Sequence, residues 1–179
     1  MGSYNGFTSI NDAMSSILEA TASNPYIIQV CPGIFTEDDI VVKSFVTIER
    51  IDSDRTIINP IATSKIVVKL SSNSSIKNVT IDCLSILAVV AINVFNAVDT
   101  KIENVQIANA TIAMGFGAEL SNNTTCTMSC VHVIGSIDVI NIIAINTSII
   151  NVTCFDLQVV DATSGGQTIA VSGNGALLS

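Results

Sequence analysis

Apolar and polar positions alternate along most of the chain in short stretches, and these stretches recur at a nearly constant spacing. One set of strand-like segments, with steps of 26, 24 and 23 residues, begins at Ile76, Ile102, Cys126 and Ile149. A second set, with steps of 24, 26, 25 and 26 residues, is matched at Leu70, Val94, Leu120, Ile145 and Val171. Two strand sets that share one period, without a helical segment between them, predict a stacked β-solenoid.

The alternation within each segment predicts which side chains face the interior. The inward positions form two ladders, Val79/Val105/Ser129/Val152 and Ile81/Ile107/Val131/Cys154. The outward positions form two more, Thr80/Gln106/Cys130/Thr153 and Asp82/Ala108/His132/Phe155. Asparagine tolerates a left-handed backbone and can bond to a stacked neighbour. We therefore expect an asparagine ladder at a bend, interrupted by Met128 and formed by Asn78, Asn104 and Asn151.

The first part of the chain has helical periodicity instead. Apolar residues at helical spacing predict a helix over residues 9–20. Thr8 or Ser9 can cap its start, and Asn24-Pro25 is expected to end it. After a short strand over residues 26–31, the chain is expected to turn and to continue in strands.

We expect three segments. They are a disordered or vector-derived N-terminus (1–7), a helical cap (8–24) and the coils (25–179), the last two forming one domain over 8–179.

Three stretches near the start carry a family resemblance: Ser-Ile-Asn-Asp-Ala-Met at 9–14, Tyr-Ile-Ile-Gln-Val-Cys-Pro-Gly-Ile-Phe-Thr at 26–36, and Ser-Phe-Val-Thr-Ile at 44–48. They resemble the capping helix, the Pro-Gly strand-turn and the next strand of the pectin-lyase-like superfamily. The resemblance implies an all-β, right-handed parallel β-helix of about six coils with a short N-terminal capping α-helix. It implies no single activity, because this fold carries lyases, hydrolases, epimerases, tailspikes, adhesins and structural proteins.

The catalytic motifs of enzymes with this fold are largely missing. Pectate lyases use an arginine base and an aspartate cluster that binds calcium, and neither Arg50 nor Arg55 stands in the corresponding motif. Of the polygalacturonase motifs only the Asp-Asp pair is matched, at Asp38-Asp39. An acidic loop in solvent explains that dipeptide without catalysis.

The remaining candidate for a catalytic pair consists of His132 and the outward Asp82. The predicted register separates them by two coils, about 9–10 Å, which is beyond hydrogen-bonding distance. The carboxylates show no evident pairing and are dispersed over Asp82, Asp99, Glu103, Asp138, Asp156 and Asp161. We therefore assign no catalytic, cofactor-binding or metal-binding residue, and we interpret His132 as a surface histidine.

Composition narrows the range of partners. The chain of 179 residues has a formal charge of −8 with only 7 lysines and arginines. This balance argues against nucleic acid, against anionic membranes and against strongly anionic polysaccharides. The longest apolar run, residues 86–92, is much shorter than the about 18 residues of a membrane helix, and we interpret it as two buried strands joined at a bend. Membrane insertion is not expected.

Five cysteines leave at least one unpaired. Cys126 and Cys130 would lie roughly 13 Å apart along a strand, too far for a disulfide. One histidine and no Cys-x-x-Cys motif give no zinc signature. We interpret Cys154, at an inward position of the repeat, as a small buried apolar residue, and we expect neither a metal nor a cofactor.

These patterns favour a non-enzymatic structural or adhesive module, exposed on a virion or cell surface or otherwise extracellular, that contacts glycans. Two alternatives stay open: a carbohydrate-active enzyme (a polysaccharide lyase, a glycoside hydrolase or an inactive remnant of one) and an oligomeric assembly module. Residues 175–179 resemble residues 117–121, so the sequence predicts a solenoid without a C-terminal cap. Such an end is expected to be covered by a second copy or by an adjoining domain.

Overall fold

The computed structural model describes residues 6–51, 55–61, 66–83, 90–118, 122–136, 138–144, 149–160 and 169–173. In this part of the chain one short helix, α1 (Ile10–Ser16), precedes a series of strands. The first strands are β1 (Tyr26–Val30), β2 (Gly33–Thr36), β3 (Ile40–Val42), β4 (Val46–Arg50), β5 (Thr56–Asn59), β6 (Ile66–Leu70), β7 (Ser75–Lys77) and β8 (Thr80–Asp82). The later strands are β9 (Val90–Phe95), β10 (Thr100–Ala108), β11 (Ile112–Ala118), β12 (Asn123–Ile134), β13 (Asp138–Ala144), β14 (Ile149–Val160) and β15 (Ile169–Gly173).

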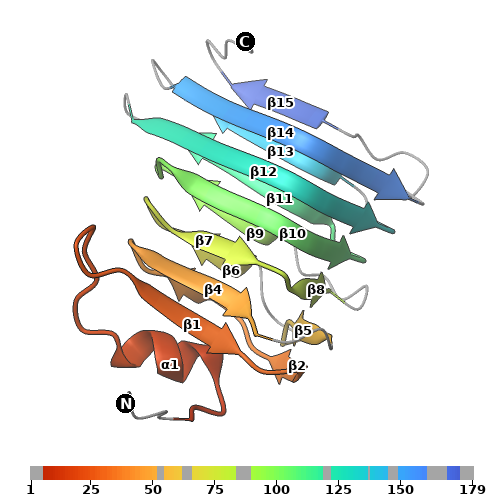
Figure 1. The fold of residues 1–179 in the computed structure, drawn as a ribbon. Helices are drawn as coiled ribbons and strands as arrows, with labels where there is room; N and C mark the ends of the chain where they lie inside the picture. Colours follow the sequence, from red (N-terminus) through yellow and green to blue (C-terminus); the bar gives the residue numbers. More distant parts are fainter. Residues whose placement is uncertain are drawn as a thin grey trace.

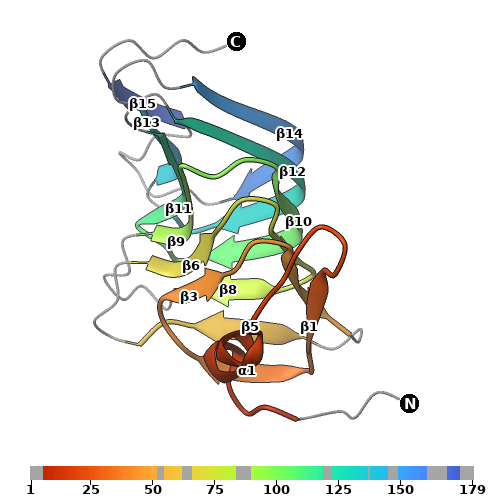
Figure 2. The same cartoon turned by 90° about the vertical axis from the view of Figure 1, so that its left-hand side faces the viewer.

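The strands stack into two sheets that face each other across one core (Figures 1 and 2). A nine-stranded sheet contains β1, β4, β7, β10, β12 and β14 together with β2, β5 and β8. A six-stranded sheet runs in the order β15-β13-β11-β9-β6-β3. Neighbouring strands in both sheets are parallel, and each strand pairs with its equivalent in the next coil. The predicted fold class, an all-β parallel β-helix, is therefore confirmed.

The number of turns is smaller than expected. The described residues complete about four turns of the solenoid, against about six coils in the prediction. Several connections between strands, such as residues 161–168, lie outside the described residues. The predicted bend within residues 86–92 falls largely outside them as well, as do residues 1–5 and 175–179.

A bend divides each coil of the larger sheet. Strands β7 and β8 pair with the first and the second part of β10, so the long strands β10, β12 and β14 run through the bend without a break. The residue at the bend has a left-handed backbone in four successive coils, with φ of 58° at Asn78, 50° at Asn104, 51° at Cys130 and 58° at Asp156. We call these four residues the bend column.

The bend column corrects the predicted register. The asparagine ladder exists between Asn78 and Asn104, since Asn104 Nδ2 donates to Asn78 Oδ1 over 2.9 Å. Its continuation is Cys130 and Asp156, whereas Asn151 lies earlier in β14 and pairs with Thr125. The predicted alignment of the later coils was therefore wrong.

The inward ladder shows the same shift. Ile76 pairs with Ile102, Ile102 with Met128, and Met128 with Cys154, each partner 26 residues further along the chain. Met128 is fully buried and belongs to the core instead of interrupting a ladder. The other inward ladders are Val79/Val105/Val131/Leu157 and Ile81/Ile107/Val133/Val159, so the predicted inward place of Ser129 was wrong.

The outer positions of the larger sheet shift accordingly. They form the ladders Thr80/Gln106/His132/Gln158 and Asp82/Ala108/Ile134/Val160, instead of the outward sets predicted from the sequence.

The smaller sheet matches the prediction in its first coils only. Leu70 pairs with Val94 as expected. Val94 then pairs with Phe116, Phe116 with Ile142, and Ile142 with Val171. The predicted partners Leu120 and Ile145 lie outside the described residues.

Helix α1 closes the lower end of the stack (Figure 2). Its buried Ile10 and Met14 join the core. Ser9 is the N-cap, with its side chain accepting from the Asp12 N–H, as the sequence predicted. The helix ends at Ser16 instead of residue 20, because Ile17 already has an extended backbone, and Leu18 is 97% exposed instead of buried.

Two charged side chains from the coils hold the ends of this helix. The carboxylate of Glu37 accepts the N–H groups of Ile10 and Asn11 over 2.7 and 2.8 Å. At the other end, Lys43 Nζ donates to the carbonyl oxygen of Ile17 over 2.7 Å. Each charge has the sign that the helix end favours. The cap is therefore fastened to the first coil by polar contacts as well as by its apolar face.

Candidate polar groove at the bend

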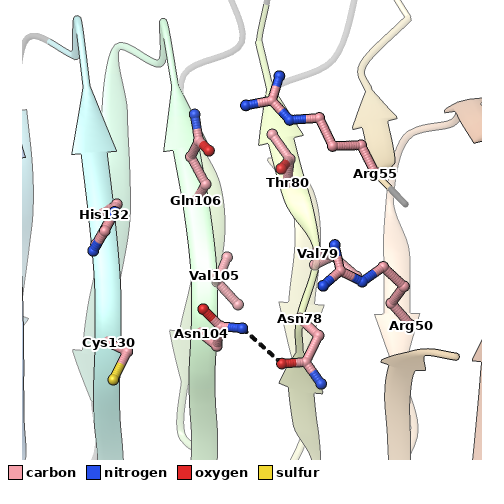
Figure 3. A pocket seen from close by; sticks show the side chains of 10 residues that line it. All are labelled: Arg50, Arg55, Asn78, Val79, Thr80, Asn104, Val105, Gln106, Cys130 and His132. Carbon is pink, nitrogen blue, oxygen red and sulfur yellow. Dashed lines mark hydrogen bonds between the residues drawn. The ribbon is translucent and has the colours of Figure 1, made fainter. Parts of the chain in front are cut away.

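A polar groove of about 150 Å³ lies on the outer surface of the larger sheet, along the bend (Figure 3). Its walls come from four successive coils, and none of the described side chains that line it is a carboxylate. We call this hollow the polar groove, and its lining residues are Arg50, Arg55, Asn78, Val79, Thr80, Asn104, Val105, Gln106, Cys130 and His132.

Strand register brings both arginines to one edge of the groove. Because Glu49 pairs with Lys77, Arg50 stands beside the bend residue Asn78. Arg55 immediately precedes β5, in which Ile57 pairs with Thr80. In Figure 3 the two guanidinium groups extend from this edge over the coil that carries Val79 and Thr80.

The outward ladder Thr80/Gln106/His132 forms the rest of the surface. Thr80 pairs with Gln106, and Gln106 with His132. Two strand spacings separate Thr80 from His132, about 10 Å. His132 therefore lies across the groove from the arginines (Figure 3).

His132 and Asp82 do not share an outward ladder, contrary to the predicted register. Asp82 pairs with Ala108, two positions along the strand from the ladder of His132. Asp82 Oδ1 accepts from Asn109 Nδ2 over 2.9 Å. Asp82 is thus engaged at the end of its strand and does not line the polar groove.

The groove concentrates positive charge on an acidic protein. Both arginines and the single histidine of the chain line it, although the net charge is −8. The ion pair seen among the described residues joins Lys77 and Glu103, and neither arginine has a carboxylate partner there. The Nε atom of Arg50 is buried and has no hydrogen-bond partner in this part of the chain.

The other acidic candidates have structural roles or lie elsewhere. Asp38 Oδ1 accepts the Ile61 N–H over 2.8 Å, and the Asp38 carbonyl accepts from Asn11 Nδ2. Asp39 adopts a left-handed backbone with φ of 49°. The Asp38-Asp39 pair therefore shapes the loop beneath α1. Of the remaining carboxylates, Glu103 pairs with Lys77, Asp156 accepts from Gln158, and Asp161 lies outside the described residues.

The cysteines divide into buried and exposed groups. All five are free thiols, and only Cys83 and Cys126 are buried, so the expected burial of Cys154 was wrong. Cys154 points inward from β14, but no described strand of the larger sheet lies beyond it. Burial, reinforced by the nearby Asp82 and Asp38, raises the pKa of Cys83 to about 12. Burial likewise raises the pKa of Cys126 to about 11.

Metal and membrane chemistry find no support in the described residues. They contain no group of three or more His, Cys, Asp or Glu side chains arranged to hold a metal ion. Within the same ranges, no helix has the length and apolar character needed to cross a bilayer.

A second hollow is larger but chemically poorer. It has a volume of about 550 Å³ and lies between α1 and strand β1, beside Phe7, Tyr26 and Ile27. Among the described residues, no charged side chain lines it. Binding sites normally combine an apolar surface with a few convergent polar groups. We therefore take the smaller polar groove as the candidate functional site.

In the sequence, His132 lies far from the two arginines of this groove, and the three residues belong to no common motif. Arg50, Arg55 and His132 were each compared with motifs of known enzymes, and none matched. The signal that could have joined them is the constant 26-residue step from Thr80 to Gln106 to His132, together with the place of Arg50 beside Asn78. Only the corrected register puts them on one surface.

Comparisons with known proteins support the fold. No family model and no curated protein matches the chain. A candidate glycosyl hydrolase from Parabacteroides merdae ATCC 43184 has a similar structure, with a TM-score of 0.50 and 14% identity over 94% of this chain and 88% of that chain. A pectin methylesterase solved with a hexasaccharide gives a TM-score of 0.49 and 13% identity, over 95% of this chain and 58% of its own length. At such identity the likeness to the hydrolase shows a shared β-helix fold alone.

Proposed function

We propose that this protein is a non-enzymatic structural or adhesive β-helix module, displayed on a virion or cell surface, that contacts glycans through the polar groove. The observation that carries the proposal is the gathering of Arg50, Arg55, Gln106 and His132 around one hollow on the outer sheet. Their donors and acceptors suit the hydroxyl groups of a sugar.

The lack of a carboxylate among the described residues of the groove supports a binding role instead of cleavage. Most glycosidases need two Asp or Glu side chains on either side of the scissile bond. In the part of the chain that the structure describes, no Asp or Glu lines this groove, and Asp82 and Glu103 already have partners. The enzyme alternative, active or as an inactive remnant, rests on the shared fold with the hydrolase neighbour.

A glycan array and a reducing-sugar release assay on the same panel test the proposal. We expect binding of at least one glycan class without release of reducing ends. The substitution His132→Ala should weaken binding and leave the fold intact by circular dichroism. Release of reducing ends that His132→Ala abolishes would establish the enzyme alternative instead.

Assembly into oligomers is a second candidate function, favoured by the apolar surface of β14. Ile149, Phe155 and Val160 are 54%, 61% and 51% exposed. The inward residues Ile150, Val152, Leu157 and Val159 are only partly buried. Contact with a second copy at this end would cover both groups. Light scattering as a function of protein concentration tests this function independently of glycan binding.

A further inference from the structure

We infer that the arginine edge of the polar groove is a binding site for a compact oxyanion, namely a sulfate, phosphate or carboxylate group. The inference deepens the proposed function, because such a group would be the anionic substituent of the bound glycan. The net charge argues against anionic partners in general, and the inference makes the polar groove an exception. A charge of −8 describes the whole chain, whereas the cations of this groove act at short range.

Geometry supplies the first argument. Arg50 and Arg55 stand at the same bend, on either side of a short connection, and both line the groove. Figure 3 shows their guanidinium groups directed over the same neighbouring coil. Arginine presents a planar fork of N–H donors that matches an oxyanion in two-point contacts. Two such forks at one edge suit an anion with several oxygens.

Unmet hydrogen bonding supplies the second argument. Arg50 Nε is buried and has no acceptor among the described residues. Leaving a buried donor of a charged group unpaired costs free energy. The described residues that line the groove beside the arginines, among them Asn78 and Thr80, include no anionic side chain. The guanidinium of Arg50 thus has no acidic partner among the described residues that would compete with an oxyanion.

The remaining lining residues suit the neutral part of such a ligand. From the coil of Arg50 to that of His132 the groove crosses three strand spacings, about 14 Å. A compact oxyanion occupies only the arginine end of that length. Gln106 and His132 are then free to contact hydroxyl groups further along. This division predicts that free oxyanions bind weakly and that glycans carrying the same group bind more tightly.

The first experiment uses inorganic sulfate and phosphate as probes. The thermal midpoint is measured in sodium sulfate, sodium phosphate and sodium chloride at equal ionic strength, and the dissociation constant of sulfate is measured by calorimetry. We expect the two oxyanions to raise the midpoint more than chloride does, since a ligand of the folded state stabilises it. The double variant Arg50→Gln/Arg55→Gln should lose this difference and raise the dissociation constant at least tenfold. Lys101→Gln, which removes an exposed cation outside the groove, should keep the wild-type response.

A second double variant distinguishes loss of the binding site from loss of the fold. Arg50→Lys/Arg55→Lys keeps both charges but removes the planar forks, so sulfate binding should still weaken, by about tenfold. An oxyanion effect of wild-type size in either double variant, or none in the wild type, would overturn the inference.

The second experiment separates this inference from the proposed function. The glycan array contains matched sulfated, phosphorylated, uronic-acid and neutral members, which also identifies the source of the oxyanion. Preference for one anionic class that Arg50→Gln/Arg55→Gln abolishes supports both ideas. Equal binding of neutral glycans, unaffected by the double variant, refutes the oxyanion site and keeps the glycan function. Binding of free sulfate without any glycan binding supports the site and refutes the function.

Discussion

At the residue scale, the bend column contains one side chain that is poorly matched to its backbone. Asn78 and Asn104 tolerate the left-handed conformation and bond to each other. Cys130 has the same conformation, with φ of 51°, but carries no amide that could continue the ladder. Left-handed backbone costs roughly 1–2 kcal/mol for most L-residues, and asparagine is among the residues that adopt it most readily.

Cys130→Asn should therefore stabilise the protein. The new amide would tolerate the bend and could bond to Asn104 on one side and to Asp156 on the other, a gain of about 1 kcal/mol. Urea unfolding measures the change. Cys130→Ala is the matched control, because it removes the thiol without adding an amide. If the asparagine variant were no more stable than the alanine variant, the ladder would contribute nothing at this coil.

The buried thiols predict a loss of stability at alkaline pH. The pKa of Cys83 is raised from 9.0 to about 12, and that of Cys126 from 9.0 to about 11. Above pH 9 these thiols ionise in the unfolded chain but stay protonated in the folded one, so proton release favours unfolding. The stabilisation is complete below pH 9 and is lost as the pH rises toward 11–12.

Urea unfolding at about pH 8 and about pH 10.5 should show this decline. Cys83→Ala should reduce the decline by about 1–2 kcal/mol, since one pKa unit corresponds to about 1.4 kcal/mol. Cys31→Ala, which changes an exposed thiol, should leave it as in the wild type. An equal decline in the wild type and in the Cys83 variant would contradict the assignment.

At the element scale, the short helix α1 depends on contacts with the coils. A helix of 7 residues is marginal by itself. Glu37→Gln removes the charge and one of the two acceptors at its N-terminus, and should cost about 1–2 kcal/mol. Glu19→Gln is the control, because Glu19 is an exposed carboxylate beyond the end of the helix. Thermal unfolding of the two variants measures the difference, and equal midpoints would show that Glu37 does not hold the cap.

The inward ladders make a prediction for the larger sheet. Ile107 is fully buried between Ile81 and Val133. Ile107→Asp would bury a carboxylate without a partner, at a cost of several kcal/mol. Thr127→Asp, at an exposed position on β12, should cost less than about 1 kcal/mol. Thermal midpoints within a degree or two of each other would mean that the inward face is wrongly assigned.

The same elements show what the sequence could and could not predict. Most strands were found at their places, because apolar alternation and β-branched residues are local signals. The register of the later coils was not found, because the match of Cys126 to Ile102 relied on short sequence similarity. In the structure the left-handed bend sets the register, and at Cys130 and Asp156 it no longer carries asparagine. The end of α1 was missed because the chain must turn at Ile17 to enter the first coil.

At the scale of the whole molecule, the candidate site shows where sequence reasoning stops. Arg50 and His132 are separated by three coils and share no motif, so only stacking in the correct register joins them. The net charge of −8 gave no sign of a local cationic surface. The fold, in contrast, follows from repetition, which the sequence shows directly.

If copies of the chain contact each other through β14, the protein should form oligomers in solution. Light scattering at micromolar concentration should give a mass above the 18.7 kDa of one chain. Ile149→Lys/Phe155→Lys places charges on the exposed surface of β14 and should restore the mass of a monomer. Ile27→Lys changes a residue that is 59% exposed at the opposite end and should leave the assembly intact. A wild-type monomer at every concentration would exclude this interface.

The 26-residue step that recurs in the larger sheet from β7 and β8 to β14 makes the length of the molecule adjustable. One coil adds about 4.8 Å to the stack, and its neighbours above and below contact it through equivalent positions. Duplicating or removing a whole coil would therefore change the span between the two ends in fixed increments while preserving α1 and its anchors. The number of coils sets the distance between the two ends of the stack. A target of different length therefore requires a different number of coils and no new fold.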